Sequence, residues 1–135
     1  MFRVLVVEDN PADVDLLLEC LNPIGAQTTV ARNGLEALDV LRRDESRLID
    51  LVLLDVNLPG MSGHEVLQEI RSDSRLHLTP VIVLSHSDHE RDIARMYRLG
   101  ANCYVRKPET LGELRKAVWK IEEFWLGLVA LPARH

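Results

Sequence analysis

Cysteine is scarce in this sequence of 135 residues, which contains only Cys20 and Cys103. Because the two are far apart and form no Cys-x-x-Cys pair, they indicate neither a disulfide framework nor a zinc site. The five histidines, at positions 64, 77, 86, 89 and 135, also lack the spacing of a metal-binding motif, and we expect them at the surface. The sequence therefore gives no support to a metal site built from thiolates or imidazoles.

Long apolar runs and clusters of basic residues are absent as well. No stretch approaches the roughly 20 apolar residues of a membrane-spanning helix, and the chain becomes acidic at Glu8 and Asp9, too early for a signal peptide. The 16 basic and 21 acidic residues give a net charge of −5, which disfavours nucleic acid and anionic membranes as partners. We therefore expect a cytoplasmic protein, and its length predicts a single domain.

Short aliphatic segments alternate with segments of helical periodicity along the chain. The aliphatic segments are residues 3–7, 27–31, 51–55, 80–84 and 102–105, and an amphipathic pattern follows each. Asn10, Ser62 and Thr110 stand where helix N-caps are expected, and Gly100 stands where a helix should end. This order predicts an α/β protein with a flavodoxin-like, doubly wound (βα)5 fold, whose central five-stranded parallel sheet has the order 2-1-3-4-5.

Polar residues stand at the carboxyl ends of the predicted strands, where ligands bind in such sheets. Glu8 and Asp9 follow the first strand, Asp55 ends the third, Ser85 follows the fourth and Lys107 follows the fifth. Since the first and third strands should be neighbours, the carboxylates of Asp9 and Asp55 would repel each other unless a cation holds them ionised. Mg²⁺ suits these ligands, because it binds one or two carboxylates together with water and phosphate.

Each of these residues could instead have an ordinary structural role. Asp55 precedes a Pro-Gly turn and could form it, and Lys107 could be a solvated lysine. Asp9 could cap the first helix, although Asn10 and Asp13 are better placed to do so. The coincidence of all of them at one edge of the sheet favours a phosphoryl-transfer site, with Asp55 as nucleophile and acceptor and the lysine and serine as donors.

Together these residues resemble the receiver domain of a bacterial two-component response regulator. The resemblance covers positions 3 to about 123 and rests on the order and spacing of several motif residues: Glu8-Asp9, Asp55, Asn57, Pro59-Gly60, Ser85, Gly100-Ala101, Tyr104 and Lys107-Pro108. It implies that a sensor histidine kinase transfers a phosphoryl group from its own histidine to Asp55. The chain would then be a signalling switch that catalyses only its own phosphorylation and dephosphorylation.

The resemblance also implies a role for each motif residue. Asp9 and Asp55 would ligate Mg²⁺ together with the backbone carbonyl of Asn57, and Glu8 would assist through water. The other roles concern the switch itself: Lys107 would bond the phosphoryl oxygen, Ser85 would rotate toward it, and Tyr104 would swing inward.

Two features next to the motif residues lead to further predictions. The bond between Lys107 and Pro108 is predicted to be cis, so that the chain can leave the fifth strand while the lysine points back at Asp55. His86 stands after the switch serine, where receivers usually have a small residue. We expect its imidazole to slow exchange of the phosphoryl group.

A narrower resemblance, to single-domain regulators that pair with phytochrome-type histidine kinases, rests on residues 8–13 (EDNPAD), 102–104 (NCY) and 121–126 (IEEFWL). It implies a phytochrome-type kinase as the partner, and a further protein as the target of the switch.

The C-terminal part of the chain is unusually apolar. We expect residues 1–123 to form the receiver domain, with the fifth helix burying Leu111, Leu114, Ala117, Val118 and Ile121. Residues 124–135 would then be an apolar extension that folds back over the domain or, as we favour, forms an interface. A symmetric homodimer would cover it, and the expected interface residues are Trp119, Phe124, Trp125, Leu126 and Leu128.

Two other functional classes share parts of this pattern. An aspartyl-phosphate hydrolase of the haloacid dehalogenase type also has a nucleophilic Asp after a strand, but it uses a second Asp two residues later as an acid. Asn57 stands at that position. A flavodoxin would need a Ser/Thr-rich phosphate loop after the first strand, where this sequence has Asn10-Pro11-Ala12. A receiver that cannot be phosphorylated is disfavoured, because the acceptor, lysine and serine are all present.

Overall fold

The computed structural model describes residues 2–43 and 49–132. Within these residues the strands are β1 (Arg3–Val7), β2 (Gln27–Ala31), β3 (Leu51–Leu54), β4 (Val81–Ser85) and β5 (Cys103–Arg106). They form one parallel sheet in the order β2-β1-β3-β4-β5, which confirms the predicted topology. The register pairs Val7 of β1 with Leu54 of β3, so both strands end at the same level. The residues that follow them therefore meet at one edge of the sheet.

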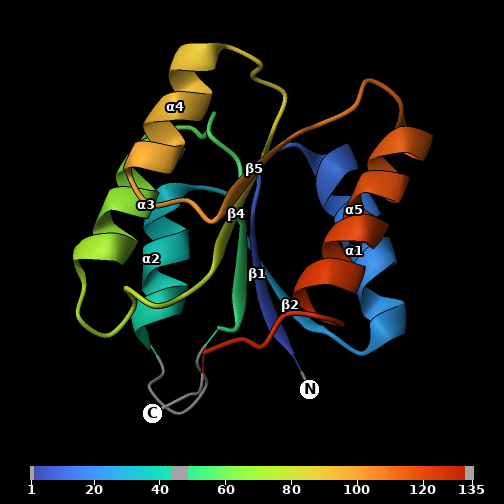
Figure 1. Cartoon of the computed structure of the whole chain (residues 1–135), viewed down its shortest axis with the longest axis horizontal. Coiled ribbons are helices and arrows are strands. Elements are labelled where there is room, and N and C mark those ends of the chain that lie inside the picture. Colours follow the sequence, from blue (N-terminus) through green and yellow to red (C-terminus); the bar gives the residue numbers. More distant parts are fainter. Residues whose placement is uncertain (1, 44–48, 133–135) are drawn as a thin grey trace.

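Helices cover both faces of the sheet (Figure 1). One face carries α2 (Gly34–Arg43), α3 (Gly63–Ser72) and α4 (Glu90–Arg98), and the other carries α1 (Pro11–Leu21) and α5 (Leu111–Trp125), with a short 3-10 turn, η1 (Asn22–Ile24), after α1. Successive strand residues point to opposite faces, so each face has its own apolar core. Leu5 of β1 lies in the core under α2 and α3, and Val6 lies in the core under α1 and α5. No helix in the described residues has the length and apolar character needed to cross a bilayer.

The helix boundaries follow from the capping residues. The Asn10 side chain accepts hydrogen bonds from the first backbone N–H groups of α1. Ser62 and Glu65 form a reciprocal capping box at α3, and the Thr110 side chain caps α5. Gly100 follows α4 with φ of 103°, in the left-handed region that favours glycine. These positions agree with the predicted ones.

The predicted geometry of one peptide bond and the predicted exposure of one histidine are wrong. The described residues contain no cis peptide bond, so Lys107–Pro108 is trans. A cis bond is not needed, because the long lysine side chain still places its Nζ 3.7 Å from Asp55. His64 is buried under α4, with Nε2 4.0 Å from Asp92, although we expected every histidine at the surface. Residues 77, 86 and 89 are exposed as expected, and residue 135 lies outside the described residues.

The end of the chain differs in detail from the prediction. Helix α5 continues to Trp125, so the expected boundary after residue 123 falls within its last turn. Trp125 and Leu126 pack partly against the core under α1 and α5, and Figure 1 shows the tail continuing across the end of the sheet where the strands begin. Leu111 is exposed because it starts the helix, whereas Glu122 is buried, contrary to the expected apolar stripe.

Candidate phosphoacceptor site

Three carboxylates meet at the carboxyl ends of β1 and β3. Glu8 and Asp9 follow β1, Asp55 follows β3, and one oxygen of each lies within 4.8 Å of the others. Glu8 and Asp55 are buried, whereas Asp9 is exposed to solvent. The strand order thus brings together the carboxylates that the sequence singled out.

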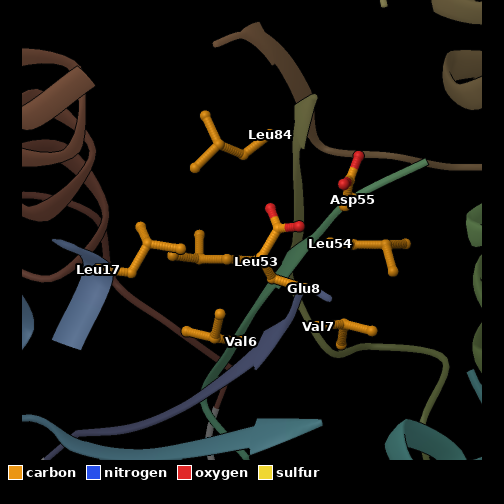
Figure 2. A pocket seen from close by; sticks show the side chains of 8 residues that line it. All are labelled: Val6, Val7, Glu8, Leu17, Leu53, Leu54, Asp55 and Leu84. Atoms are coloured by element: carbon orange, nitrogen blue, oxygen red, sulfur yellow. The ribbon is translucent and has the colours of Figure 1, made fainter. Parts of the chain in front are cut away.

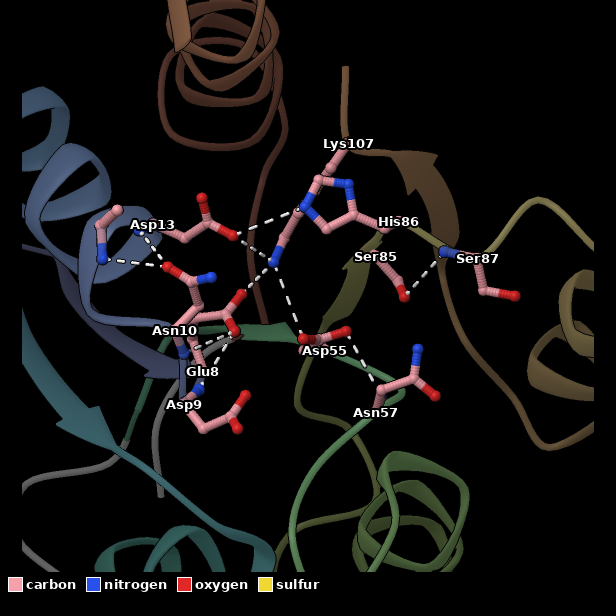
Figure 3. Close-up of polar contacts among 11 residues, drawn as sticks. Glu8, Asp9, Asn10, Asp13, Asp55, Asn57, Ser85, His86, Ser87 and Lys107 are labelled. Atoms are coloured by element: carbon pink, nitrogen blue, oxygen red, sulfur yellow. Dashed lines mark hydrogen bonds and ion pairs between the residues drawn. The ribbon is translucent and has the colours of Figure 1, made fainter. Parts of the chain in front are cut away.

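The side chain of Lys107 extends from the end of β5 into this cluster (Figure 3). Its Nζ donates a hydrogen bond to Glu8 Oε1, donates another to Asp13 Oδ2 at 2.9 Å, and lies 3.7 Å from Asp55 Oδ2. The side chain is almost completely buried. The ammonium group therefore lies within ion-pair distance of three carboxylates.

Asp13 was not identified from the sequence as part of this site. Asn10 alone caps α1, and the Asp13 carboxylate, which is buried, binds Lys107 and lies 3.7 Å from His86 Nε2. Its interpretation as a helix cap is therefore wrong. The sequence did offer one signal for this role of Asp13. It is an acidic residue in the first turn of a helix that Asn10 already caps.

Burial dominates the electrostatics of the ion pair. Burial and, to a smaller extent, the charge of Asp55 together raise the pKa of Glu8 to about 7, although the hydrogen bond from Lys107 opposes them. Burial alone would lower the pKa of Lys107, but its hydrogen bond to Glu8 and the charge of Asp55 outweigh burial and raise it. The lysine is therefore an ammonium at neutral pH.

The arrangement of donors leaves Asp9 and Asp55 able to bind a cation. Both oxygens of Glu8 are engaged, Oε1 by Lys107 and Oε2 by the backbone N–H groups of Asp9 and Asn10 at 3.0 and 3.2 Å. The Asp9 carboxylate accepts no hydrogen bond within residues 2–43 and 49–132, and Asp55 Oδ1 accepts one of 3.3 Å from the backbone of Asn57. Hard oxygen ligands with excess negative charge suit a divalent cation such as Mg²⁺ or Mn²⁺.

The inner side of the carboxylates is apolar. Figure 2 shows the Glu8 carboxylate among aliphatic side chains that line a small hollow, with Asp55 beside them; the aliphatic residues are Val6, Val7, Leu17, Leu53, Leu54 and Leu84. The hollow has no space for a water molecule. This apolar lining agrees with burial as the main cause of the raised pKa of Glu8.

The loop after β4 connects the serine and tyrosine of the predicted switch. Ser85 is fully buried, and its Oγ accepts a 3.3 Å hydrogen bond from the backbone N–H of Ser87. The half-buried Tyr104 donates its hydroxyl to the Ser87 carbonyl at 2.8 Å, and Ser87 Oγ donates to Asp92 of α4 at 2.6 Å. Ser87, which is not among the predicted switch residues, thus joins Ser85, Tyr104 and α4.

Gly63 fixes the distance between α3 and the backbone that carries Asp55. A Cβ atom at this position would lie 2.4 Å from the carbonyl oxygen of Asp55, which no side chain could relieve by rotation. Glycine therefore allows α3 to begin directly against the loop after β3.

Comparisons with known proteins agree on one family. The family model described as the response regulator receiver domain matches residues 4–119. Response regulator Rcp1 of Synechocystis sp. is 41% identical over 136 residues, which cover 96% of this chain and 92% of Rcp1.

Solved structures show the same likeness. The phosphorylated cyanobacterial phytochrome response regulator RcpA superposes with a TM-score of 0.94 at 42% identity, covering 98% of this chain and 99% of RcpA. The Mn²⁺-bound form of Rcp1 has a TM-score of 0.92 at 39% identity, covering 98% of this chain and 100% of that one.

Proposed function

We propose that this chain, which belongs to the response regulator receiver family, is a phosphoacceptor switch of two-component signalling and that Asp55 is its acceptor. Receiver domains of this family act as such switches. The observation that carries the assignment is the position of Asp55, at the end of β3, 3.7 Å from the buried Lys107 ammonium and beside two further carboxylates. Nothing in the comparisons supports a hydrolase of the haloacid dehalogenase type, and Asn57 lacks the acidic proton that its mechanism needs.

The residues suggest a simple in-line transfer. An oxygen of Asp55 attacks the phosphorus of a phosphohistidine, and the P–N bond breaks with its electron pair left on the imidazole, which takes a proton from solvent. Lys107 would donate to a phosphoryl oxygen, and the Ser85 hydroxyl would supply a second donor. Tyr104 would follow Ser85 inward, because both are attached to Ser87.

A bound divalent cation would neutralise charge on the phosphoryl oxygens, and we propose Mg²⁺ for this role. Asp9 and Asp55 would hold it directly, together with the backbone carbonyl of Asn57. Glu8 would reach it only through water, because both of its oxygens already accept hydrogen bonds. Mn²⁺ binding, followed by electron paramagnetic resonance, should weaken strongly in Asp9→Asn; unchanged affinity would remove Asp9 from the proposed ligands.

Phosphorylation of Asp55 can be tested with acetyl phosphate and Mg²⁺ as the donor system. Intact-protein mass spectrometry should show a single added phosphoryl group on the parent chain and none on Asp55→Asn. Asp39→Asn, which changes an exposed carboxylate on α2, should label like the parent. Labelling that persists in Asp55→Asn would refute the assignment.

We further propose that the phosphodonor is a phytochrome-type sensor histidine kinase in the cytoplasm. The support is the likeness to RcpA, a phytochrome response regulator, over nearly the whole of both chains. Transfer from purified, autophosphorylated kinases decides this point: a phytochrome-type kinase should transfer to Asp55 within minutes, faster than kinases of other sensor classes. Equal rates from all of them would contradict the proposed pairing. Co-purification with and without beryllium fluoride would identify the target of the switch.

The proposed homodimer would use the outer side of α5 and the tail. Trp119 and Phe124 are each 50% exposed and Leu128 is 75% exposed, whereas Trp125 and Leu126 are partly buried by their own domain. Trp119 and Phe124 lie five residues apart, about 140° around the helix, so they do not form one patch. Phe124 packs edge-on against Trp125, which contacts Cys103 of β5. We therefore assign the dimer contact to the side of α5 nearest β5, with Phe124 at its centre.

A further inference from the structure

The Lys107 ammonium is bound away from the acceptor in this structure. It donates hydrogen bonds to Glu8 and to Asp13, the latter at 2.9 Å. Its distance to Asp55 Oδ2 is 3.7 Å, which is too long for a hydrogen bond. A phosphoryl group on Asp55 would therefore compete with Glu8 and Asp13 for the three protons of the ammonium.

Asp13 has no other evident task at this position. It belongs to α1 and lies on the opposite side of the ammonium from Asp55 in Figure 3. It is outside the group of carboxylates close enough to share a metal ion. Asn10 supplies the helix cap, yet the Asp13 side chain is only 9% exposed, with its carboxylate directed at Lys107. A buried carboxylate with this contact must influence where the ammonium can go.

We propose that Asp13 is a positioning residue that restrains Lys107 and so opposes phosphorylation of Asp55. The inference rests on the proposed function of Asp55 as the acceptor. Two effects act in the same direction. Asp13 competes with the phosphoryl oxygens for the protons of the ammonium, and its buried negative charge repels the incoming negative group. The phosphorylated state is then favoured when the contact between Lys107 and Asp13 weakens.

The same contact gives His86 a role. Its Nε2 lies 3.7 Å from Asp13 Oδ2, and His86 begins the loop that follows Ser85 at the end of β4. When Lys107 moves to the phosphoryl group, the imidazole is the partner that remains for the Asp13 carboxylate. Asp13, on α1, thus has Lys107 as its partner before phosphoryl transfer and His86 as its partner afterwards.

The rate of phosphorylation by acetyl phosphate with Mg²⁺, followed by intact mass, tests this restraint. Asp13→Asn keeps the size of the side chain and removes its charge, and we expect the rate constant to rise about fivefold or more. Asp15→Asn, an exposed residue on the same helix, removes the same net charge but leaves Lys107 bound, and its rate should stay within about twofold of the parent. A rate for Asp13→Asn equal to or below the parent rate overturns the proposal.

A second measurement uses the parent chain and does not depend on the folding of a variant. The carboxyl carbon of Asp13 and the Nζ of Lys107 are observed by NMR before and after addition of beryllium trifluoride with Mg²⁺, which stands in for the phosphoryl group. Both resonances should shift when the ammonium leaves Asp13, whereas the carboxyl carbon of Asp15 should not. An Asp13 resonance that stays in place would overturn the restraint. If the parent chain accepts no phosphoryl group at all, the proposed function fails instead.

Discussion

Two buried glutamates have pKa values raised to about 7 by burial, in very different surroundings. Glu8 lies at the carboxyl edge of the sheet and accepts hydrogen bonds from Lys107 and from two backbone N–H groups. Glu122 lies in α5, on the side that packs against α1, and its Oε1 has no hydrogen-bond partner among the described residues. Its charge also raises the pKa of the Cys20 thiol on α1, after the larger effect of burial. At Glu8, Lys107 and a backbone hydrogen bond thus offset part of the effect of burial, whereas at Glu122 burial acts alone.

Lys107→Met removes the positive charge beside Glu8 and should have the largest effect on stability. Glu8, Asp13 and Asp55 would remain buried without a cation, so we expect the free energy of unfolding at pH 7 to fall by about 3 kcal/mol. Urea denaturation measures this change, and Lys116→Met, at an exposed position of α5, should alter it little. Stability equal to that of the parent would mean that the ammonium does not hold the carboxylates in place.

Glu122→Gln removes the buried negative charge from α5 and should stabilise the protein at neutral pH. The folded pKa of Glu122 is about 7 and its ordinary value is 4.5, so the folded state binds the proton more tightly. The contribution of Glu122 to stability therefore falls as pH rises from about 4.5 to about 7, by roughly 2–3 kcal/mol when solvent screening is taken into account, and is constant above that range. Unfolding experiments at several pH values should show a shallower pH dependence in the variant.

Glu123→Gln provides the matched control, because it makes the same change at the next, exposed position. Since Glu8 titrates in the same direction and range, part of the pH dependence should remain in Glu122→Gln. An identical pH dependence in parent, Glu122→Gln and Glu123→Gln would show that the Glu122 carboxyl is solvated in solution.

The sequence could predict the fold and most of the site for a physical reason. Alternating strands and helices leave few ways to build a parallel sheet, and residues after its strands must meet at one edge. The sequence could therefore identify three site residues from their positions at the carboxyl ends of the strands: Asp55, Lys107 and Ser85. The burial of His64 and Glu122, by contrast, depends on how α4 and α1 pack beside them.

Contacts between elements account for the remaining errors. The partner of Asp13 depends on how the first turn of α1 faces the end of β5, which no local pattern encodes. The sequence predicted a cis bond at Lys107–Pro108 because the backbone was expected to turn the lysine toward Asp55. The flexible lysine side chain reaches Asp55 from a trans bond.

The proposed dimer depends on exposed apolar side chains of α5 and the tail, and not on buried charge. If the proposed dimer is centred on the side near β5, Phe124→Ala should weaken its affinity about tenfold, in the range of a good interface residue. Trp119→Ala should change it less than twofold, because Trp119 lies one turn after Arg115, which binds Glu19 of α1. Analytical ultracentrifugation of the full chain measures both.

Point variants are preferable to a chain ending at residue 123, because truncation would also remove Trp125 and Leu126 from the core. A full chain that remains monomeric with and without beryllium fluoride would exclude the dimer. A larger loss from Trp119→Ala than from Phe124→Ala would place the interface on the α1 side instead.

The smallest effect is expected from His86→Ala, at the outer rim of the acceptor site. The imidazole is 56% exposed and lies 3.7 Å from Asp13, so it neither fills the space over Asp55 nor replaces Lys107. Alanine opens the rim of the site, which should speed both loading from acetyl phosphate and loss of the phosphoryl group. It also removes the partner that Asp13 keeps when Lys107 moves, which acts against loading, so we expect each rate to rise by only about twofold. Intact mass against time gives both rates, with His89→Ala, on an exposed part of the same loop, as the control. Slower loss in His86→Ala would show that the imidazole promotes hydrolysis, and unchanged rates would confine its contact to Asp13.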